Sequence, residues 1–239
     1  MNTAEARLAD RRVTEWFVGE KARREREYEE RTAATASRVQ TVRSVITISR
    51  QFGAGGHTVV QAVAERLGPQ WQVWDKEIIE QLAHSAQVRT EMVEALDEQT
   101  QSWMGEMIHT LFKGYVLETM GYRRYLAQVL LALAQQGNKI LLGRGANFVL
   151  RDALNVRLRA SEECRAQVIM QRDSITHAEA LKKIHQVDHD RAAFTRTVFN
   201  REVDNPSEYD MTLQTDTLGL DAAAAAIVAA CQAKFETAV

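Results

Sequence analysis

Residues 44–67 read SVITISRQFGAGGHTVVQAVAERL, and this stretch decides the fold. Residues 45–49 are rich in β-branched side chains, a glycine cluster follows them, and residues 59–67 repeat apolar side chains at helical spacing. This order predicts a strand, a tight loop and a helix. Glycines let the loop backbone turn several N–H groups inward, and the positive N-terminus of the helix adds to them, so we expect an anion cradle that binds a phosphate chain.

The loop departs from the phosphate-binding consensus G-x-x-x-x-G-K-[ST] at two positions. Gly55 fits the second glycine, but Arg50 occupies the position of the first glycine and Gly56 that of the lysine. Thr58 can supply the hydroxyl that binds magnesium if the loop carries one extra residue. The alternative for the glycines is a tight turn without a ligand.

The remaining strands and helices alternate along the chain. We expect strands at 71–74, 139–142, 155–160 and 209–215, a mostly helical segment from Lys76 to about residue 136, a helix capped by Ser161, and an alanine-rich helix from Leu220. Alternating strands and helices predict a parallel sheet covered on both faces. A chain of 239 residues with 45% hydrophobic content fits one α/β domain plus appendages.

The N-terminal extension, residues 1–42, is dominated by arginine and glutamate and lacks proline, which favours a long solvated helix. A short apolar stripe at helical spacing consists of Leu8, Val13, Trp16 and Phe17. The stripe predicts that the helix docks on the main domain or on a second subunit, which would make a homodimer. A free, partly disordered arm is the alternative.

Composition and charge indicate which binding partners and which cellular compartment to expect. The formal net charge is -2, so the chain lacks the basic excess that drives binding to nucleic acid, and we expect no nucleic-acid partner. The two cysteines, Cys164 and Cys231, have no second thiol or histidine at metal-ligand spacing. No signal peptide and no apolar run of membrane-spanning length is present, so we expect a cytoplasmic protein without membrane contact.

The segments ITISRQFGAGGHTVVQAVAERLG, VWDKEIIEQLA, KILLGRGANFVL, VDHDRAAF and SEYDMTLQTD together resemble the cytidylate kinase-like family, over roughly residues 44–230. The resemblance implies the three-layer P-loop NTPase fold of nucleoside monophosphate kinases at 43–239, with an acceptor-binding helical insert at 76–136 and a lid region at 172–205. It also implies phosphoryl transfer from ATP, with Mg²⁺, to a nucleoside monophosphate such as cytidylate or to a similar small acceptor.

The same resemblance assigns roles to residues on the donor side. The donor phosphates would be bound by Gly53, Ala54, Gly55, Gly56, His57 and Thr58, and Thr58 would also bind the metal. A glycine pair followed by a basic residue commonly replaces the G-K pair in this family; here that residue is His57, where arginine is more usual. Because a transferring phosphoryl group needs a fixed cation, the catalytic candidates are Arg50, His57 and Arg191. Arg50 could equally be an exposed or paired arginine.

Two residues are candidates for binding the acceptor. Asp75 ends the second strand and Arg144 stands between two glycines after the third. Asp75 could instead cap the following helix, and Arg144 could form a structural salt bridge. Gln214, after the last strand, stands where the resemblance leads us to expect asparagine near the nucleotide base.

The expected lid carries several more charged side chains, namely Arg172, Lys182, Lys183, Asp188, Arg191 and Arg196. Asp188 and Arg191 could also form an ordinary i,i+3 ion pair. His185 and His189 lie one helical turn apart, but no further ligand completes a metal site, so solvated histidines explain them better. A second reading of the whole chain is a nucleotide-binding regulatory protein that has lost turnover and presents its N-terminal helix to a partner.

Overall fold

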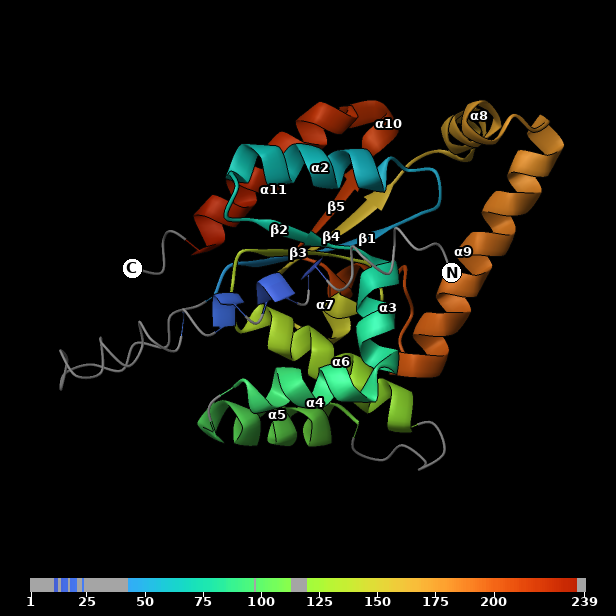
Figure 1. The fold of residues 1–239 in the computed structure, drawn as a ribbon. Coiled ribbons are helices and arrows are strands. Elements are labelled where there is room, and N and C mark those ends of the chain that lie inside the picture. The colour runs from blue at the N-terminus through green and yellow to red at the C-terminus, as the bar shows by residue number, and fades with distance from the viewer. Residues whose placement is uncertain are drawn as a thin grey trace. The chain divides into compact units, whose positions relative to one another are not determined.

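In the computed structural model, the chain divides into two units (Figure 1). The first comprises residues 1–43 and 76–137, and the second comprises residues 44–75 and 138–239. The structure describes residues 11–12, 14–16, 18–20, 23, 43–96, 98–112 and 120–235. The expected stripe residues Leu8, Val13 and Phe17 lie outside these ranges.

The second unit contains a five-stranded sheet in the order β2-β3-β1-β4-β5. Its strands are β1 (Val45–Arg50), β2 (Gln72–Trp74), β3 (Lys139–Leu142), β4 (Leu154–Arg159) and β5 (Met211–Gln214). Every neighbouring pair is parallel, which confirms the parallel sheet predicted from the alternating pattern. All carboxyl ends therefore lie at one edge, with β1 in the centre. Ligands of open α/β sheets bind at that edge.

Helices cover both faces of this sheet (Figure 1). The helices of the unit are α2 (Gly56–Leu67), α7 (Ala146–Val149), α8 (Glu162–Asp173), α9 (His177–Phe199), α10 (Thr215–Leu218) and α11 (Leu220–Phe235). The helices α2 and α11 lie on one face, and α7 lies on the other. On the α2 and α11 side, Ile46, Ile48, Val60, Val156 and Ile227 form part of one buried apolar cluster. Burial of such side chains contributes about 1.5–3 kcal/mol each and fixes β1 beneath α2.

Polar side chains pair across β1 and β4 at two positions along these strands. Thr47 donates to Asn155 Oδ1 at 2.6 Å, and Arg157 donates through one guanidinium nitrogen to Ser49 Oγ at 2.8 Å. The Asn155 amide also donates to the Leu150, Arg151 and Ala153 carbonyls. These bonds satisfy polar groups that would be costly to bury alone, and they fix the register of the two strands.

The first unit is helical, as predicted for residues 76–136 outside the gaps in the described ranges. Its helices are α3 (Lys76–His84), α4 (Ala86–Glu94), α5 (Glu98–Leu111) and α6 (Met120–Ala134). In the N-terminal segment, Trp16 is fully buried and its carbonyl accepts a hydrogen bond from Gln136 Nε2 at 2.6 Å. The part of the extension around Trp16 is therefore docked rather than a free arm.

Candidate active site

The glycine loop joins the central strand β1 to α2, as the sequence predicts, and its backbone requires glycine at two positions. Gly53 has φ 84° and Gly55 has φ 73°, both in the left-handed region that side chains disfavour. A Cβ on Gly53 would lie 3.1 Å from the Arg165 carbonyl oxygen, and a Cβ on Gly55 would contact the Leu220 side chain. Conformation and close packing therefore both require the glycines.

The loop amides fall into two groups. The Gln51 N–H donates to Leu158 O at 3.0 Å, and the Ala54 N–H donates to Gln51 O at 3.3 Å, so these two shape the loop itself. Within the described part of the chain, no hydrogen-bond partner is found for the N–H groups of Gly53, Gly55, Gly56, His57 and Thr58. The side chains of His57 and Thr58 are exposed. Unpaired amides at the first turn of a helix are an anion-binding arrangement.

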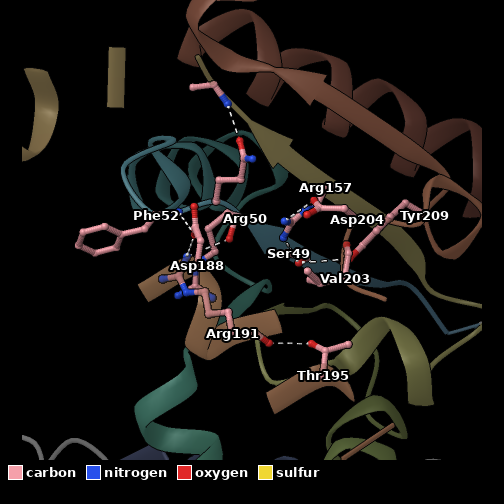
Figure 2. Close-up of polar contacts among 12 residues, drawn as sticks. Ser49, Arg50, Phe52, Arg157, Asp188, Arg191, Thr195, Val203, Asp204 and Tyr209 are labelled. Atoms are coloured by element: carbon pink, nitrogen blue, oxygen red, sulfur yellow. Dashed lines mark hydrogen bonds and ion pairs between the residues drawn. The ribbon is translucent and has the colours of Figure 1, made fainter. Parts of the chain in front are cut away.

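A carboxylate on α9 holds the loop, as Figure 2 shows for Asp188 and Phe52. Asp188 Oδ1 accepts from the Phe52 N–H at 2.8 Å, and Asp188 Oδ2 accepts from Arg165 at 2.5 Å. The same Arg165 nitrogen lies 3.3 Å from the Phe52 carbonyl oxygen. Asp188 and Arg165 therefore fix both polar groups of the Phe52 backbone.

Arg191 binds the loop one position earlier. Its guanidinium donates to the Arg50 carbonyl at 2.9 Å, whereas its distance to Asp188 Oδ1 is 3.9 Å. The expected i,i+3 pair thus exists, but each of the two side chains also makes a shorter contact with the loop backbone. The guanidinium carbons of Arg191 and Arg172 lie 5.6 Å and 5.0 Å from the Phe52 ring centroid, so cationic side chains border the loop.

The other expected lid residues do not reach the loop backbone through any hydrogen bond seen in the described residues. Asp173 binds Arg172 and Lys183, at 2.7 Å and 2.8 Å, and these hydrogen bonds hold the pKa of the Asp173 carboxyl well below its usual range. Arg196 pairs with Glu202, and Lys182 is exposed.

The histidine pair of the expected lid makes no hydrogen bond to the loop among the described residues. His185 pairs with Glu162 at 2.7 Å, and His189 is exposed. Among the residues with described positions, no group of His, Cys, Asp or Glu side chains is arranged to bind a metal.

The turn after β3 has an unusual backbone. Gly143, Arg144 and Gly145 have φ of 90°, 55° and 64°, and the left-handed conformation costs a non-glycine residue such as Arg144 about 1–2 kcal/mol. A Cβ on Gly143 would contact the Arg50 guanidinium, and a Cβ on Gly145 would contact the Phe199 ring. The Arg144 guanidinium lies 4.6 Å from the Phe194 ring centroid. Strain of this kind persists where surrounding contacts hold it, often at functional sites.

The predicted candidates follow the carboxyl ends of different strands. Asp75 follows β2, Arg144 follows β3, and the glycine loop follows β1, the strands being neighbours in this order. The glycine loop and the turn after β3 lie in contact, because the Arg50 guanidinium lies against Gly143, next to Arg144. Asp75 is half-buried and directly precedes α3.

Comparison with known proteins decides the family. The model of the cytidylate kinase-like family matches residues 45–217. The chain belongs to the cytidylate kinase-like family. The resemblance read from the sequence motifs is therefore confirmed, and nucleotide-dependent phosphoryl transfer is the general chemistry that this membership supports.

Individual relatives of this cytidylate kinase-like chain are distant. A cytidylate kinase of Pyrobaculum calidifontis is 25% identical over 129 residues, covering 49% of this chain and 70% of that protein. An uncharacterised protein from Eubacterium ventriosum superposes with a TM-score of 0.61 at 17% identity, covering 80% of this chain and 99% of that chain. A shikimate kinase from Bacteroides thetaiotaomicron gives a TM-score of 0.42 at 17% identity, covering 81% and 98%.

The family match, the superposition with a TM-score of 0.61 and the parallel sheet confirm the α/β fold that the sequence of this cytidylate kinase-like chain predicts. No helix in the described ranges is long and apolar enough to span a bilayer.

Sequence reasoning missed several residues that support the site of this cytidylate kinase-like chain. Thr215 is buried, and its hydroxyl lies 3.1 Å from Ala54 O and 3.0 Å from Arg159 O, which ties the start of α10 to the loop. Arg165 resembled any exposed arginine of a helix, and no sequence signal marks it. Thr215 follows the last strand of a parallel sheet, and this position could have identified it.

A second missed group surrounds Ser49 near the end of β1 (Figure 2). Buried Arg157 donates to Ser49 and, at 2.8 Å, to Asp204, while the Tyr209 hydroxyl donates to Val203 O at 2.7 Å and lies 3.4 Å from Ser49 Oγ. Burial raises the pKa of Tyr209, so its hydroxyl stays protonated as a donor. The group anchors the end of β1 directly before Arg50.

Proposed function

We propose that this protein is a kinase that transfers the γ-phosphoryl group of ATP to a nucleoside monophosphate, with cytidine monophosphate as the first candidate. The observation that carries the proposal is the group of loop amides, between the central strand and α2, for which the described residues offer no hydrogen-bond partner, together with the arginines that contact the same loop. Family membership supports the reaction class, and the acceptor is our inference from it.

On the donor side, the N–H groups of Gly53, Gly55, Gly56 and His57 would bind the phosphates, and Ala54 would shape the loop around them. The exposed Thr58 hydroxyl, in the first turn of α2, would bind Mg²⁺. Bound Mg²⁺ supplies charge neutralisation at the β- and γ-phosphates. The residues fit this role because hydroxyl and phosphate oxygens are the ligands that Mg²⁺ prefers.

The cations that would stabilise the transferring group are Arg50 and Arg191, with His57 as an additional donor. The Arg50 guanidinium lies at the turn after β3, and the Arg191 guanidinium is bound to the Arg50 carbonyl. A planar guanidinium offers paired N–H donors to phosphate oxygens. Charge and position carry the reaction in this proposal, and no covalent intermediate is needed.

On the acceptor side, Asp75 would hold hydroxyl groups and Arg144 would hold the monophosphate. The strained backbone of Arg144 supports a functional role, because such strain is often kept where a side chain must be held in place for function. The helical segment 76–136 would be the acceptor-binding insert, and the lid 172–205 would close over the phosphates and exclude water, within a catalytic domain at 43–239.

The test offers magnesium and ATP to the purified chain with a panel of cytidine, uridine, adenosine and guanosine monophosphates, and it measures the diphosphate formed. We expect product with the cytidine acceptor above all others. An Arg50→Ala/Arg191→Ala double variant purified in the same way controls for contaminating kinases. Equal product from the double variant, or none from the wild type with any acceptor, contradicts the proposal.

A second function is favoured by one observation, the exposed His57 in the place where the family more usually has an arginine. The chain would then bind nucleotide as a regulatory protein without turnover. ATP binding with no product from any acceptor is the result that would support this alternative.

A further inference from the structure

The side chain of Arg50 occupies the space that a side chain at position 56 would need. A Cβ built on Gly56 would lie 2.8 Å from Arg50 Cγ, 3.4 Å from its Cβ and 3.5 Å from its Cδ. These are the stem carbons of the arginine, which cannot move aside as freely as the tip of the side chain. A residue with a side chain at position 56 would therefore displace Arg50.

The far end of the same side chain meets a second glycine. A Cβ on Gly143 would contact the Arg50 guanidinium, with Cζ at 3.5 Å. Arg50 thus runs from the first residue of α2 to the turn after β3, and both positions that it passes are glycine. Its backbone is also fixed, because the Arg50 carbonyl accepts from Arg191 at 2.9 Å. The guanidinium is consequently held at the edge of the sheet where the loop amides lie.

The two positions have opposite roles in the phosphate-binding consensus. The consensus has glycine where this chain has Arg50 and lysine where it has Gly56. We propose that positions 50 and 56 are mutually exclusive sources of the phosphate-binding cation, and that Gly56 and Gly143 are positioning residues that leave room for Arg50. This inference rests on the proposed function, because it assumes that the loop binds the phosphates of ATP.

Gly56 allows a clean test. It lies in α2 and outside the left-handed region, so alanine is a better helix former there and strains no backbone. Gly143 has φ 90°, and an alanine there would add backbone strain to the contact with Arg50. The experiment therefore uses Gly56→Ala, Arg50→Ala, the double variant Arg50→Ala/Gly56→Ala and the exchange Arg50→Gly/Gly56→Lys. Gly105→Ala in α5 is the matched control, because a Cβ there meets nothing within 4 Å.

The dissociation constant for magnesium ATP is measured by calorimetry and turnover is measured separately. We expect Gly56→Ala and Arg50→Ala each to weaken ATP binding about tenfold and to lower turnover by about a hundredfold, as loss of a transition-state cation does. The double variant should bind ATP no more weakly than Arg50→Ala, and the exchange should bind it within about threefold of the wild type, since one cation replaces the other. Gly105→Ala should bind ATP like the wild type.

Unchanged ATP binding by Gly56→Ala overturns the inference, and so do losses in the two single variants that add in the double variant. If Gly56→Ala is too unstable for the binding measurement, its melting temperature is compared with that of the double variant. Recovery of the melting temperature in Arg50→Ala/Gly56→Ala supports the steric exclusion, and equal instability of both variants contradicts it. If no acceptor gives product, the proposed kinase reaction is contradicted. The comparison of ATP binding among the variants still tests the exclusion between positions 50 and 56.

Discussion

The Asp188 carboxylate accepts a hydrogen bond from the backbone N–H of Phe52 at 2.8 Å, although 136 positions separate the two residues. Its second oxygen binds Arg165, whose side chain is only 7% exposed. One carboxylate thus joins α9, α8 and the glycine loop. The loop keeps its shape through charges on the two helices as well as through its own glycines.

Replacing Asp188 with asparagine should therefore affect both stability and the loop. The amide would keep one acceptor but would leave the buried Arg165 without its counter-charge, which should cost about 2 kcal/mol. We also expect a higher KM for ATP. Urea unfolding and steady-state kinetics measure the two effects. Asp190→Asn is the control, because Asp190 lies on the same helix and accepts a hydrogen bond from the exposed Gln186; equal effects of both variants would contradict the role of Asp188.

The Thr215 hydroxyl should stabilise the glycine loop, although Thr215 itself lies in α10. Thr215→Val removes the donor shared by Ala54 O and Arg159 O in a buried place, which should destabilise the fold by about 1–2 kcal/mol. Thr217→Val removes an exposed hydroxyl that donates to Gln214 O, and it should cost less than about 0.5 kcal/mol. Thermal unfolding of the two valine variants compares them directly, and a similar loss in both would argue against the loop contact.

Two ion pairs close together in the sequence should differ in strength. Asp204 pairs with Arg157, which is 6% exposed, whereas Glu202 pairs with Arg196, which is 54% exposed. Asp204→Ala should destabilise the protein by about 2 kcal/mol, because it leaves a buried guanidinium with fewer partners. Glu202→Ala should cost less than about 1 kcal/mol. Chemical denaturation measures the loss of unfolding free energy in each variant. A larger loss in Glu202→Ala than in Asp204→Ala would show that Arg157 does not depend on Asp204.

The Asp216 carboxylate predicts a dependence of stability on pH. Hydrogen bonds from Ser161 lower the pKa of Asp216 to about 2. A carboxyl group with a lowered folded-state pKa stabilises the fold above its unfolded pKa of about 4, and it loses this contribution as the pH falls towards about 2. The stability difference between the wild type and Asp216→Asn should therefore shrink between about pH 5 and pH 2 in urea titrations. A difference independent of pH would rule out the linkage.

The order of the strands and helices could be predicted from the sequence, because β-branched runs and helical spacing are local signals. Strand β3 matches its predicted range, whereas β5 is shorter than the expected 209–215. At its end, Thr215 already begins α10. At its start, the Asp210 N–H donates to the Asn155 carbonyl at 2.7 Å, but the Asn155 N–H donates to the Asp210 side chain at 2.8 Å, so a side chain replaces one backbone acceptor. Such an exchange of a backbone for a side-chain acceptor leaves no trace in the pattern of apolar residues.

The site was only partly predictable for a similar reason. The glycine loop carries its own signal, since its conformation excludes side chains, and Arg50 and Arg191 were candidates by charge. The contacts that support them come from Arg165, Asp188 and Thr215, which the fold brings to the loop from distant segments. Asp188 and Arg191 looked like a surface ion pair, because a spacing of three residues on a helix predicts the local partner and cannot reveal a closer one elsewhere.

The central position of β1 also determines when this protein can fold. Thr47 binds Asn155 across 108 residues, so β1 obtains its β4 neighbour only after that much more chain has been synthesised. At about 5–20 residues per second, the ribosome needs roughly 5–20 s to make this segment. During that time an apolar strand lacks one of its sheet neighbours, so a chaperone that shields nascent strands should raise the yield of native protein.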